Sequence, residues 1–322
     1  MEIRRWLRNS VITLVQAKDE DGADMATNMI NETSRVVSLE NKRHFHGRKS
    51  MGRFGSTRQV DGHCVSLTAP DSYEAGQYLR LRYAVEANRP AGRGMVIGVC
   101  SPAAGDGKSL TALNLAGALA QRRGSRVLLV DADLRRRSEV LRAMVPVSGA
   151  LAPGLSEFLL GARQHYVHDV ARRIEHTNIW VVLTGSLPIV PYEAFSSERF
   201  LLFSERARAD FDYVVIDAPP VVAVPDCKLL AEYMDGLVMV VAANQTPRVL
   251  FAQALEALGP EKILGLVFNK SDQVPPRYYR YYGRYGYAAR AKVEDIGQIA
   301  VLPAGNRDAA ENNGGNDSAV RG

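Results

Sequence analysis

Short apolar runs and helical stretches alternate along the middle of the chain. Six apolar runs have the length of buried strands, at 95–100, 126–130, 179–183, 213–216, 237–241 and 263–268. Helical patterns lie before and between them, at 74–85 after a cap at Asp71 or Ser72, and at 110–122, 197–209, 226–233 and 247–258. Strands separated by helices form βαβ units. The pattern therefore predicts an α/β fold with a mostly parallel, twisted sheet and helices on both faces.

Both ends of the chain lack this alternation. Residues 1–69 are polar and basic, and we expect them to be loosely structured. Within them, Ile3, Leu7, Val11, Leu14 and Val15 have the spacing of a short amphipathic helix, which would rest on anionic lipid or pack on its own domain or a partner. Residues 271–322 hold a tyrosine-rich stretch and a Gly/Asn/Asp tail, which we expect to be largely disordered. One folded domain is thus predicted at 70–270.

Composition narrows the class of protein. No apolar run is long enough to cross a bilayer, and the charged first residues lack the apolar core of a secretory signal. Cys64, Cys100 and Cys227 are scattered and lack metal-binding spacing, which indicates a reduced, cytoplasmic compartment. The formal net charge of +5 permits contact with an acidic membrane surface or nucleic acid and demands neither.

A candidate phosphate loop lies between the first predicted strand and the helix that follows it. It reads Ala104-Gly105-Asp106-Gly107-Lys108-Ser109-Leu110. Glycines let several N–H groups point at one anion, and the helix adds its positive end. We expect this segment to bind the phosphates of ATP, with Lys108 at the β- and γ-phosphates and the Ser109 hydroxyl on Mg²⁺. Pro102 stands where the general pattern has its first glycine, so a strand-to-helix turn with a surface lysine is the alternative.

Three aspartates follow predicted strands. Asp131 and Asp133 come after the run 126–130, and Asp217 comes directly after the run 213–216. Ligands of open α/β sheets bind at the carboxyl ends of the strands. A carboxylate beside an apolar run is costly unless it is paired or near a metal. We therefore expect all three beside the phosphate loop, with a salt bridge to Arg135 or a helix cap as the alternative for Asp133.

Together these segments resemble the bacterial tyrosine kinase family of exopolysaccharide and capsule synthesis, which is built on the P-loop NTPase fold of the septum-site and partition ATPases. The resemblance covers about residues 72–287. Asp131, Asp133 and Arg135 are similar to the family's second acidic motif, and Asp217, Pro219 and Pro220 are similar to its Walker B motif. Ala104 and Arg137 replace prolines of the family, and neither change removes a chemical group.

The resemblance implies a set of roles for these residues. ATP and Mg²⁺ are the implied cofactors, and Ser109, Asp131 and Asp217 are the implied metal ligands. Catalysis would fall to Lys108, Asp131, Asp133 and Asp217, with Asp131 favoured over Asp133 as the base. The family's ring-forming helix motif E-x-x-R-x-x-R reads Glu74, Gln77 and Arg80 here, so Glu74 and Arg80 are the expected oligomer contacts and the middle arginine is lost.

Six tyrosines are clustered near the end of the chain, at Tyr278, Tyr279, Tyr281, Tyr282, Tyr285 and Tyr287. The stretch has no aliphatic side chains and carries Arg and Gly, so it does not suit a core. Interleaved Tyr and Arg also fit nucleic-acid binding, and a sticky tail is a further alternative. Beside a phosphate site of this type we favour autophosphorylation sites that reach a neighbouring subunit, and we expect no nucleic-acid partner. Each added phosphate brings nearly two negative charges and would weaken docking at an acidic site.

The resemblance also implies partners and a location. The implied partners are other copies of the chain, in a homo-oligomer whose subunits phosphorylate one another, a membrane chain-length or export regulator that acts as activator, and a protein-tyrosine phosphatase. The protein would be cytoplasmic and peripheral at the inner face of the plasma membrane through a partner. Many relatives carry a fused membrane-spanning regulator, and we expect none here.

Two other functions stay open. A positioning or partition ATPase of the same fold would use ATP to cycle between monomer and dimer. Its loop typically carries an extra lysine near the position of Ala103, and it lacks a tyrosine tail. A non-catalytic nucleotide-binding regulatory subunit is the second alternative, against which the intact Lys108, Ser109, Asp131 and Asp217 argue.

Overall fold

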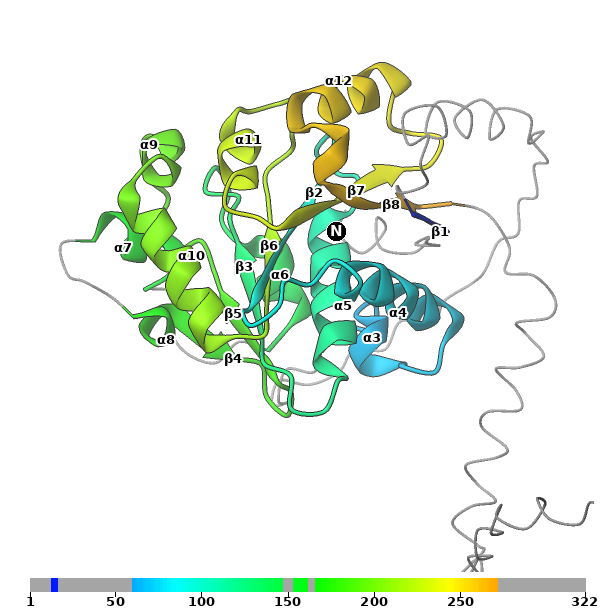
Figure 1. Ribbon diagram of the computed structural model, residues 1–322, viewed down its shortest axis with the longest axis horizontal. Helices are drawn as coiled ribbons and strands as arrows, with labels where there is room; N and C mark the ends of the chain where they lie inside the picture. The colour runs from blue at the N-terminus through cyan, green and yellow to red at the C-terminus, as the bar shows by residue number, and fades with distance from the viewer. Residues whose placement is uncertain (1–12, 17–59, 147–152, 162–165, 272–322) are drawn as a thin grey trace, which may run out of the picture.

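The structure is a computed structural model that describes residues 13–16, 60–146, 153–161 and 166–271 (Figure 1). Eight strands form one sheet in the order β1-β8-β7-β2-β6-β3-β5-β4. Their bounds are β1 Thr13–Gln16, β2 Met95–Cys100, β3 Val127–Asp131, β4 Ala171–Arg173, β5 Ile179–Val182, β6 Tyr213–Asp217, β7 Gly236–Ala242 and β8 Ile263–Asn269. The outer strands β1 and β4 pair antiparallel, and the strands between them are parallel.

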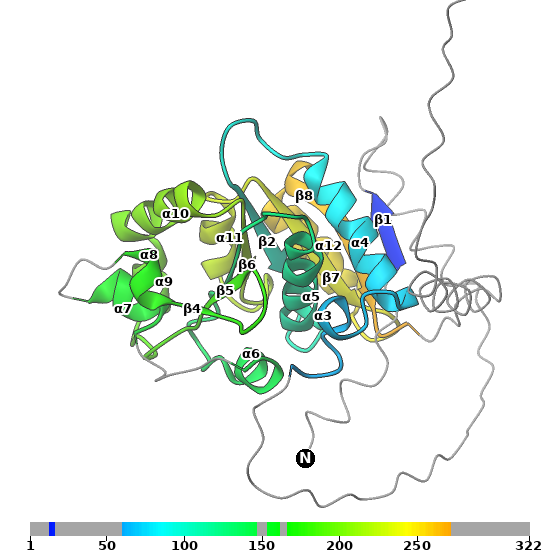
Figure 2. The same ribbon diagram turned by 90° about the horizontal axis from the view of Figure 1, so that it is seen from below.

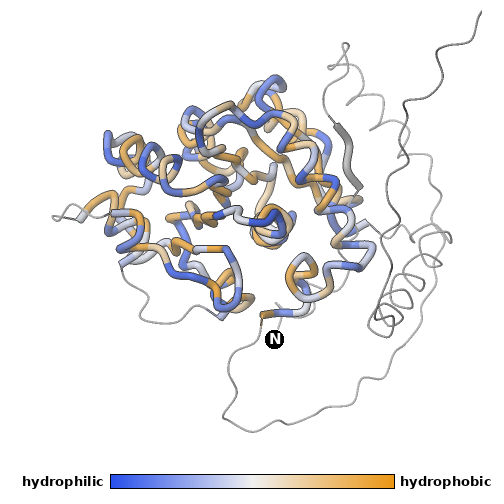
Figure 3. The backbone as a smooth tube through the Cα atoms, turned by 60° about the horizontal axis from the view of Figure 1, so that its bottom comes forward, coloured by the Kyte–Doolittle hydropathy of each residue, from blue (hydrophilic) through white to orange (hydrophobic). Residues whose placement is uncertain are grey.

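Helices cover both faces of the sheet (Figures 1 and 2). One layer contains α3 Val65–Thr68, α4 Tyr73–Glu86, α5 Lys108–Ala120 and α6 Glu139–Met144. The other contains α7 Leu155–Leu160, α8 Val167–Val170, α9 Pro191–Phe195, α10 Glu198–Asp210, α11 Asp226–Ala231 and α12 Arg248–Leu258, followed by the 3-10 turn η2 Pro260–Lys262. Apolar and polar positions mix along these helices, as Figure 3 shows.

Two apolar cores separate the sheet from its helical layers. Successive residues of β3 point to opposite cores: Leu128 and Val130 join the core under α7–α12, and Val127 and Leu129 join the core under α3–α6. Side chains of a strand alternate between the two faces of a sheet, so a strand that is buried on both sides reads as a continuous apolar run. This is the reason why the runs in the sequence predict the central strands.

The six predicted strands and five predicted helices are confirmed, with ends that differ by a few residues. Ser72 caps α4, because its side chain accepts a hydrogen bond from the Ala75 N–H at 3.1 Å. The helix predicted at the start of the chain is wrong at Thr13–Gln16, which pair with β8 as strand β1. The earlier residues of that prediction lie outside the described residues.

The packed unit includes residues on the N-terminal side of the expected boundary at residue 70. Cys64 is fully buried in the core under α3–α6. The Ser66 N–H donates to Asn114 Oδ1 at 3.0 Å, which ties α3 to α5. In the part of the chain that is described, no helix is long and apolar enough to cross a membrane.

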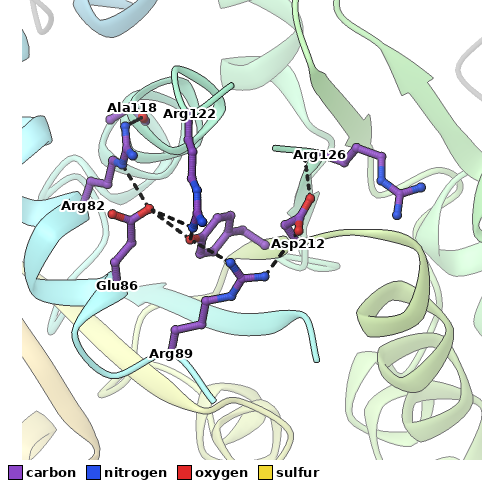
Figure 4. Close-up of polar contacts among 8 residues, drawn as sticks. Arg82, Glu86, Arg89, Ala118, Arg122, Arg126 and Asp212 are labelled. Carbon is purple, nitrogen blue, oxygen red and sulfur yellow. Dashed lines mark hydrogen bonds and ion pairs between the residues drawn. The ribbon is translucent and has the colours of Figure 1, made fainter. Parts of the chain in front are cut away.

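A polar cluster closes the amino edge of the sheet (Figure 4). The Tyr213 hydroxyl donates to Glu86 Oε1 at 3.0 Å and accepts from Arg89 and Arg122, each at 3.4 Å. Arg89 also pairs with Asp212 at 3.3 Å. These contacts join α4, the end of α5 and the start of β6. They stabilise the edge opposite to the one where the phosphate loop lies.

Candidate functional site

The phosphate loop connects the end of β2 to the start of α5. Gly105 and Gly107 have φ angles of 91° and 105°, a backbone conformation that favours glycine. Gly107 is the N-cap of α5, so the helix begins at Lys108. The first N–H groups of a helix have no carbonyl partner within it, and the helix dipole adds positive potential at that end. The loop therefore presents backbone donors to an anion.

Side chains from three segments hold this loop in shape. Asp106 Oδ2 accepts from the Ala103 N–H at 3.1 Å, and Asp106 Oδ1 accepts from the Thr246 hydroxyl at 2.7 Å. Asn269, the last residue of β8, donates from Nδ2 to the Asp106 carbonyl at 2.8 Å. A Cβ on Gly107 would overlap with Asn269 Nδ2, so this position requires glycine for space as well as for its φ angle. The loop is thus built against the ends of β7 and β8.

Four charged side chains meet beside the loop. Strands β3 and β6 are parallel neighbours whose register puts Asp131 opposite Asp217. Lys108 Nζ lies 3.7 Å from Asp133 Oδ2 and 4.0 Å from Asp217 Oδ1. None of the four residues is more than 6% exposed. The structure therefore brings together the lysine and the three aspartates that the sequence singles out.

The cluster carries more negative than positive charge. Burial is the main cause that raises the pKa of Asp131 to about 7, and the charge of Asp217 is the second. Ser138, the Asp133 N–H and the charge of Lys108 act in the opposite direction and lower this pKa. Burial also raises the pKa of Asp217, and Lys108 and Ser109 oppose that rise. Three buried carboxylates beside one buried ammonium favour a cation, because a bound cation is a large local charge that compensates them.

The residues present fit a magnesium ion shared with a phosphate. Asp217 Oδ1 is buried, and among the described residues it has no hydrogen-bond partner. The Ser109 hydroxyl lies near the same carboxylate and lowers its pKa. In the described ranges no three His, Cys, Asp or Glu side chains are placed to hold a metal alone. Magnesium usually takes one or two carboxylates together with phosphate oxygens and water.

The other candidate residues have different surroundings. Arg135 does not pair with Asp133 but binds Asp226 through two hydrogen bonds, at 2.8 and 3.1 Å. Asp133 instead pairs with Arg136 at 3.4 Å, besides Lys108. The Leu110 side chain is packed in the core, so only its backbone is available to a nucleotide, whereas Ala104 and Gly105 are exposed.

The expected oligomer contacts lie on α4. Arg80 is exposed and Glu74 is partly exposed. Gln77, at the position of the lost arginine, is 4% exposed, so it points into the fold and not toward a partner. The six clustered tyrosines lie outside the described residues.

Three further residues of the site have no place in the sequence prediction. Asn269 follows the apolar run 263–268, so the rule that selects Asp131 and Asp217 would have selected it as well. Thr246 and Ser138 are single hydroxyl residues that follow no run or motif. Ser138 lies near Asp131, whose pKa it lowers, and accepts from the Thr184 N–H at 2.9 Å.

Comparisons with known proteins agree with this geometry. The family model described as the CobQ/CobB/MinD/ParA nucleotide binding domain matches residues 97–286. The tyrosine-protein kinase YwqD of Bacillus subtilis is 31% identical over 221 residues, which cover 68% of this chain and 90% of that protein. The tyrosine-protein kinase CpsD of Streptococcus agalactiae is 31% identical over 199 residues, which cover 61% of this chain and 84% of that protein. The solved BceF tyrosine kinase domain is 29% identical with a TM-score of 0.53, covering 63% of this chain and 80% of that one.

Proposed function

This chain belongs to the bacterial tyrosine-protein kinases of the CobQ/CobB/MinD/ParA nucleotide-binding family, and we propose that it phosphorylates tyrosine with ATP. The observation that carries the proposal is the meeting of Lys108, Asp131 and Asp217 at the start of α5. A phosphate loop alone serves many reactions. The adjoining buried carboxylates add a site for a cation and a base for a hydroxyl proton.

The chain's own groups account for the steps of phosphoryl transfer. Backbone N–H groups from Ala104 to Ser109 hold the phosphates, and Lys108 neutralises charge on the γ-phosphoryl oxygens. Asp131 accepts the proton of the tyrosine hydroxyl while the tyrosine oxygen bonds to the γ-phosphorus and the bond to ADP breaks. Magnesium, when bound by Ser109, Asp131 and Asp217 directly or through water, orients and neutralises the phosphates. The Asp133 N–H, which donates to Asp131 Oδ1 at 3.1 Å, orients the Asp131 carboxylate, and the nearby Ser138 lowers its pKa.

The proposed acceptors are the six tyrosines between residues 278 and 287 of a neighbouring copy. Each phosphate brings nearly two negative charges to the segment. Repulsion from the acidic cluster then weakens its docking, so that the reaction limits itself. By its resemblance to the family, we place the protein in exopolysaccharide or capsule synthesis, at the inner face of the membrane through a membrane regulator, and with a protein-tyrosine phosphatase to reverse the reaction.

The proposal is tested with γ-labelled ATP and the purified full chain. The wild-type chain should become labelled on tyrosine, and Lys108→Met should lower the rate by at least about a hundredfold, because a single positioned charge of this kind contributes several kcal/mol to the transition state. Replacing the six clustered tyrosines by Phe should leave nucleotide binding intact and remove most of the label. Label that still enters the tail of the Lys108→Met chain would refute the site.

The same samples separate the rival ATPase function. A partition-type ATPase would release inorganic phosphate without labelling tyrosine. A regulatory subunit would bind nucleotide and do neither. If the chain alone gives no label, the assay is repeated with a membrane regulator of the kind proposed as activator.

A further inference from the structure

The loop between β5 and α9, together with the start of α9, exposes an unusual number of large apolar side chains. Leu187 is 40% exposed, Ile189 100%, Val190 44% and Tyr192 43%, and we name these four residues the apolar ledge. Single exposed aliphatic residues are ordinary on protein surfaces, but contiguous apolar patches mark binding sites. The ledge gathers four such residues within a span of six, so it needs a functional explanation.

The base of this loop is held firmly. Glu157 Oε1 accepts from the Ser186 N–H at 2.9 Å, and Glu157 Oε2 accepts from the Gly154 N–H at 2.6 Å. Gly185 has a φ angle of 75°, and a Cβ there would overlap with the Glu157 carboxylate. The turn that precedes the apolar ledge is therefore held in one conformation. A docking surface that is held in this way is preformed, whereas a loose loop would have to be ordered on binding.

The loop starts next to the catalytic carboxylate. Strand β5 is the parallel neighbour of β3, which ends at Asp131. Thr184, two residues after β5, donates its N–H to Ser138 Oγ at 2.9 Å, and Ser138 lies near enough to Asp131 to lower the pKa of that carboxyl. In Figure 1 the helix α9, which contains the last residue of the ledge, lies at the same upper edge of the molecule as α11. A ligand on the ledge would thus lie at the edge of the sheet where the phosphate loop opens.

We propose that the apolar ledge docks the tyrosine-rich segment 278–287 of a neighbouring copy and holds one of its tyrosines beside Asp131. This inference rests on the proposed function. Aromatic rings gain by packing on aliphatic side chains, and the segment has six of them. Its charged residues are Arg280 and Arg284, and it has no acidic ones. A positively charged, aromatic peptide matches an uncharged ledge that adjoins an acidic cluster.

The place where the last strand ends supports the same occupant. Strand β8 ends at Asn269, which contacts the phosphate loop, so this strand ends at the catalytic edge. Five strand spacings separate β8 from β5 in the sheet order, or about 24 Å. Tyr278 is nine residues beyond Asn269 (278 − 269), and an extended chain of that length spans up to about 30 Å. A segment at this distance along the chain can therefore extend past the catalytic edge of its own domain, which docking on a neighbouring copy requires.

The test uses two full-length chains. The kinase chain has its six clustered tyrosines changed to Ser, so that it neither accepts label nor presents rings. The substrate chain carries Lys108→Met and an intact cluster. Initial rates of phosphotyrosine formation are measured against substrate concentration for this kinase and for the same kinase with Ile189→Ser. We expect KM to rise about tenfold and kcat to stay within about twofold, because a lost aliphatic contact weakens docking and not chemistry.

Val249→Ser in the kinase chain is the matched control. Val249 is 63% exposed on α12, away from the ledge, and this change should leave KM unaltered. Thermal melting checks that each variant is folded. If the unchanged pair forms no phosphotyrosine even with the membrane regulator present, the proposed function fails. If the pair is active and Ile189→Ser gives the KM of Val249→Ser, or lowers kcat alone, the ledge is not a docking surface.

Discussion

Replacing Gly107 by Ala should damage the phosphate loop more than the same change at Gly105. Both glycines have positive φ angles, 105° and 91°, so alanine is strained at either position by about 1–2 kcal/mol. Only at Gly107 would the new Cβ overlap with Asn269 Nδ2, whereas nothing lies within 4 Å of a Cβ on Gly105. Asn269 must then move and lose its 2.8 Å hydrogen bond to the Asp106 carbonyl. That loss adds about 1–3 kcal/mol, because it leaves a buried donor and acceptor unpaired.

Urea unfolding of the full chain without nucleotide measures this difference. We expect Gly105→Ala to lower the free energy of unfolding by about 1–2 kcal/mol and Gly107→Ala by about 2–5 kcal/mol, at the same m-value. Gly107→Ala should also abolish ADP binding, since the shifted loop no longer directs its N–H groups at one point.

A double-mutant cycle with Asn269→Ala isolates the overlap. In the Asn269→Ala background, the new Cβ of Gly107→Ala no longer overlaps with an amide group. The change should then lower the free energy of unfolding only by the backbone strain, about as much as Gly105→Ala does. An equal cost of Gly107→Ala in both backgrounds would refute the reasoning, because the contact with Asn269 would then contribute nothing.

Two further predictions concern parts of the fold away from the loop. Tyr213→Phe removes the hydroxyl that donates to Glu86 at 3.0 Å, and should lower the free energy of unfolding by about 1 kcal/mol while leaving tyrosine phosphorylation unchanged, as urea unfolding and label incorporation can measure. A parallel loss of activity would contradict its purely structural role. Burial opposes the ionisation of Glu157, but the hydrogen bonds from Ser186 and Gly154 outweigh it and lower its pKa. A lowered folded-state pKa stabilises the protein above the unfolded pKa and ceases to do so as pH falls through the folded value, so the stability deficit of Glu157→Gln should shrink from pH 7 toward acid, and a constant deficit would exclude this linkage.

The central strands could be predicted because their burial appears directly in the sequence. A strand covered on both faces has to be apolar at every position, and its run ends where the sheet ends. The short elements α6–α9 and β4 carry no such signal. Helices of four to six residues are too short to be stable alone and form because the tertiary structure holds them. The error at Thr13–Gln16 has a related cause, since a few apolar residues fit a helix as well as an edge strand.

The candidate site divides in the same way. Asp131 and Asp217 were accessible to prediction because a charge after an apolar run is rare and because parallel strands end at one edge. Side-chain geometry decides which carboxylate Lys108 approaches. It also decides that Arg135 binds Asp226 and not Asp133. Sequence spacing does not determine that geometry.

The charge balance of the cluster argues that these residues are present for a ligand and not for the fold. A buried carboxylate without full compensation destabilises a protein, and removing charge from such a cluster often raises stability. Here Asp131 and Asp217 face each other across adjacent strands, and both have raised pKa values from burial. The surrounding central strands keep them in place despite that cost. Under the proposed function, a divalent cation would compensate this charge, and Lys108 and the N–H groups of α5 would hold the phosphates bound with it. The same charge imbalance that destabilises the domain by itself would then favour binding of a metal–nucleotide complex over either component alone.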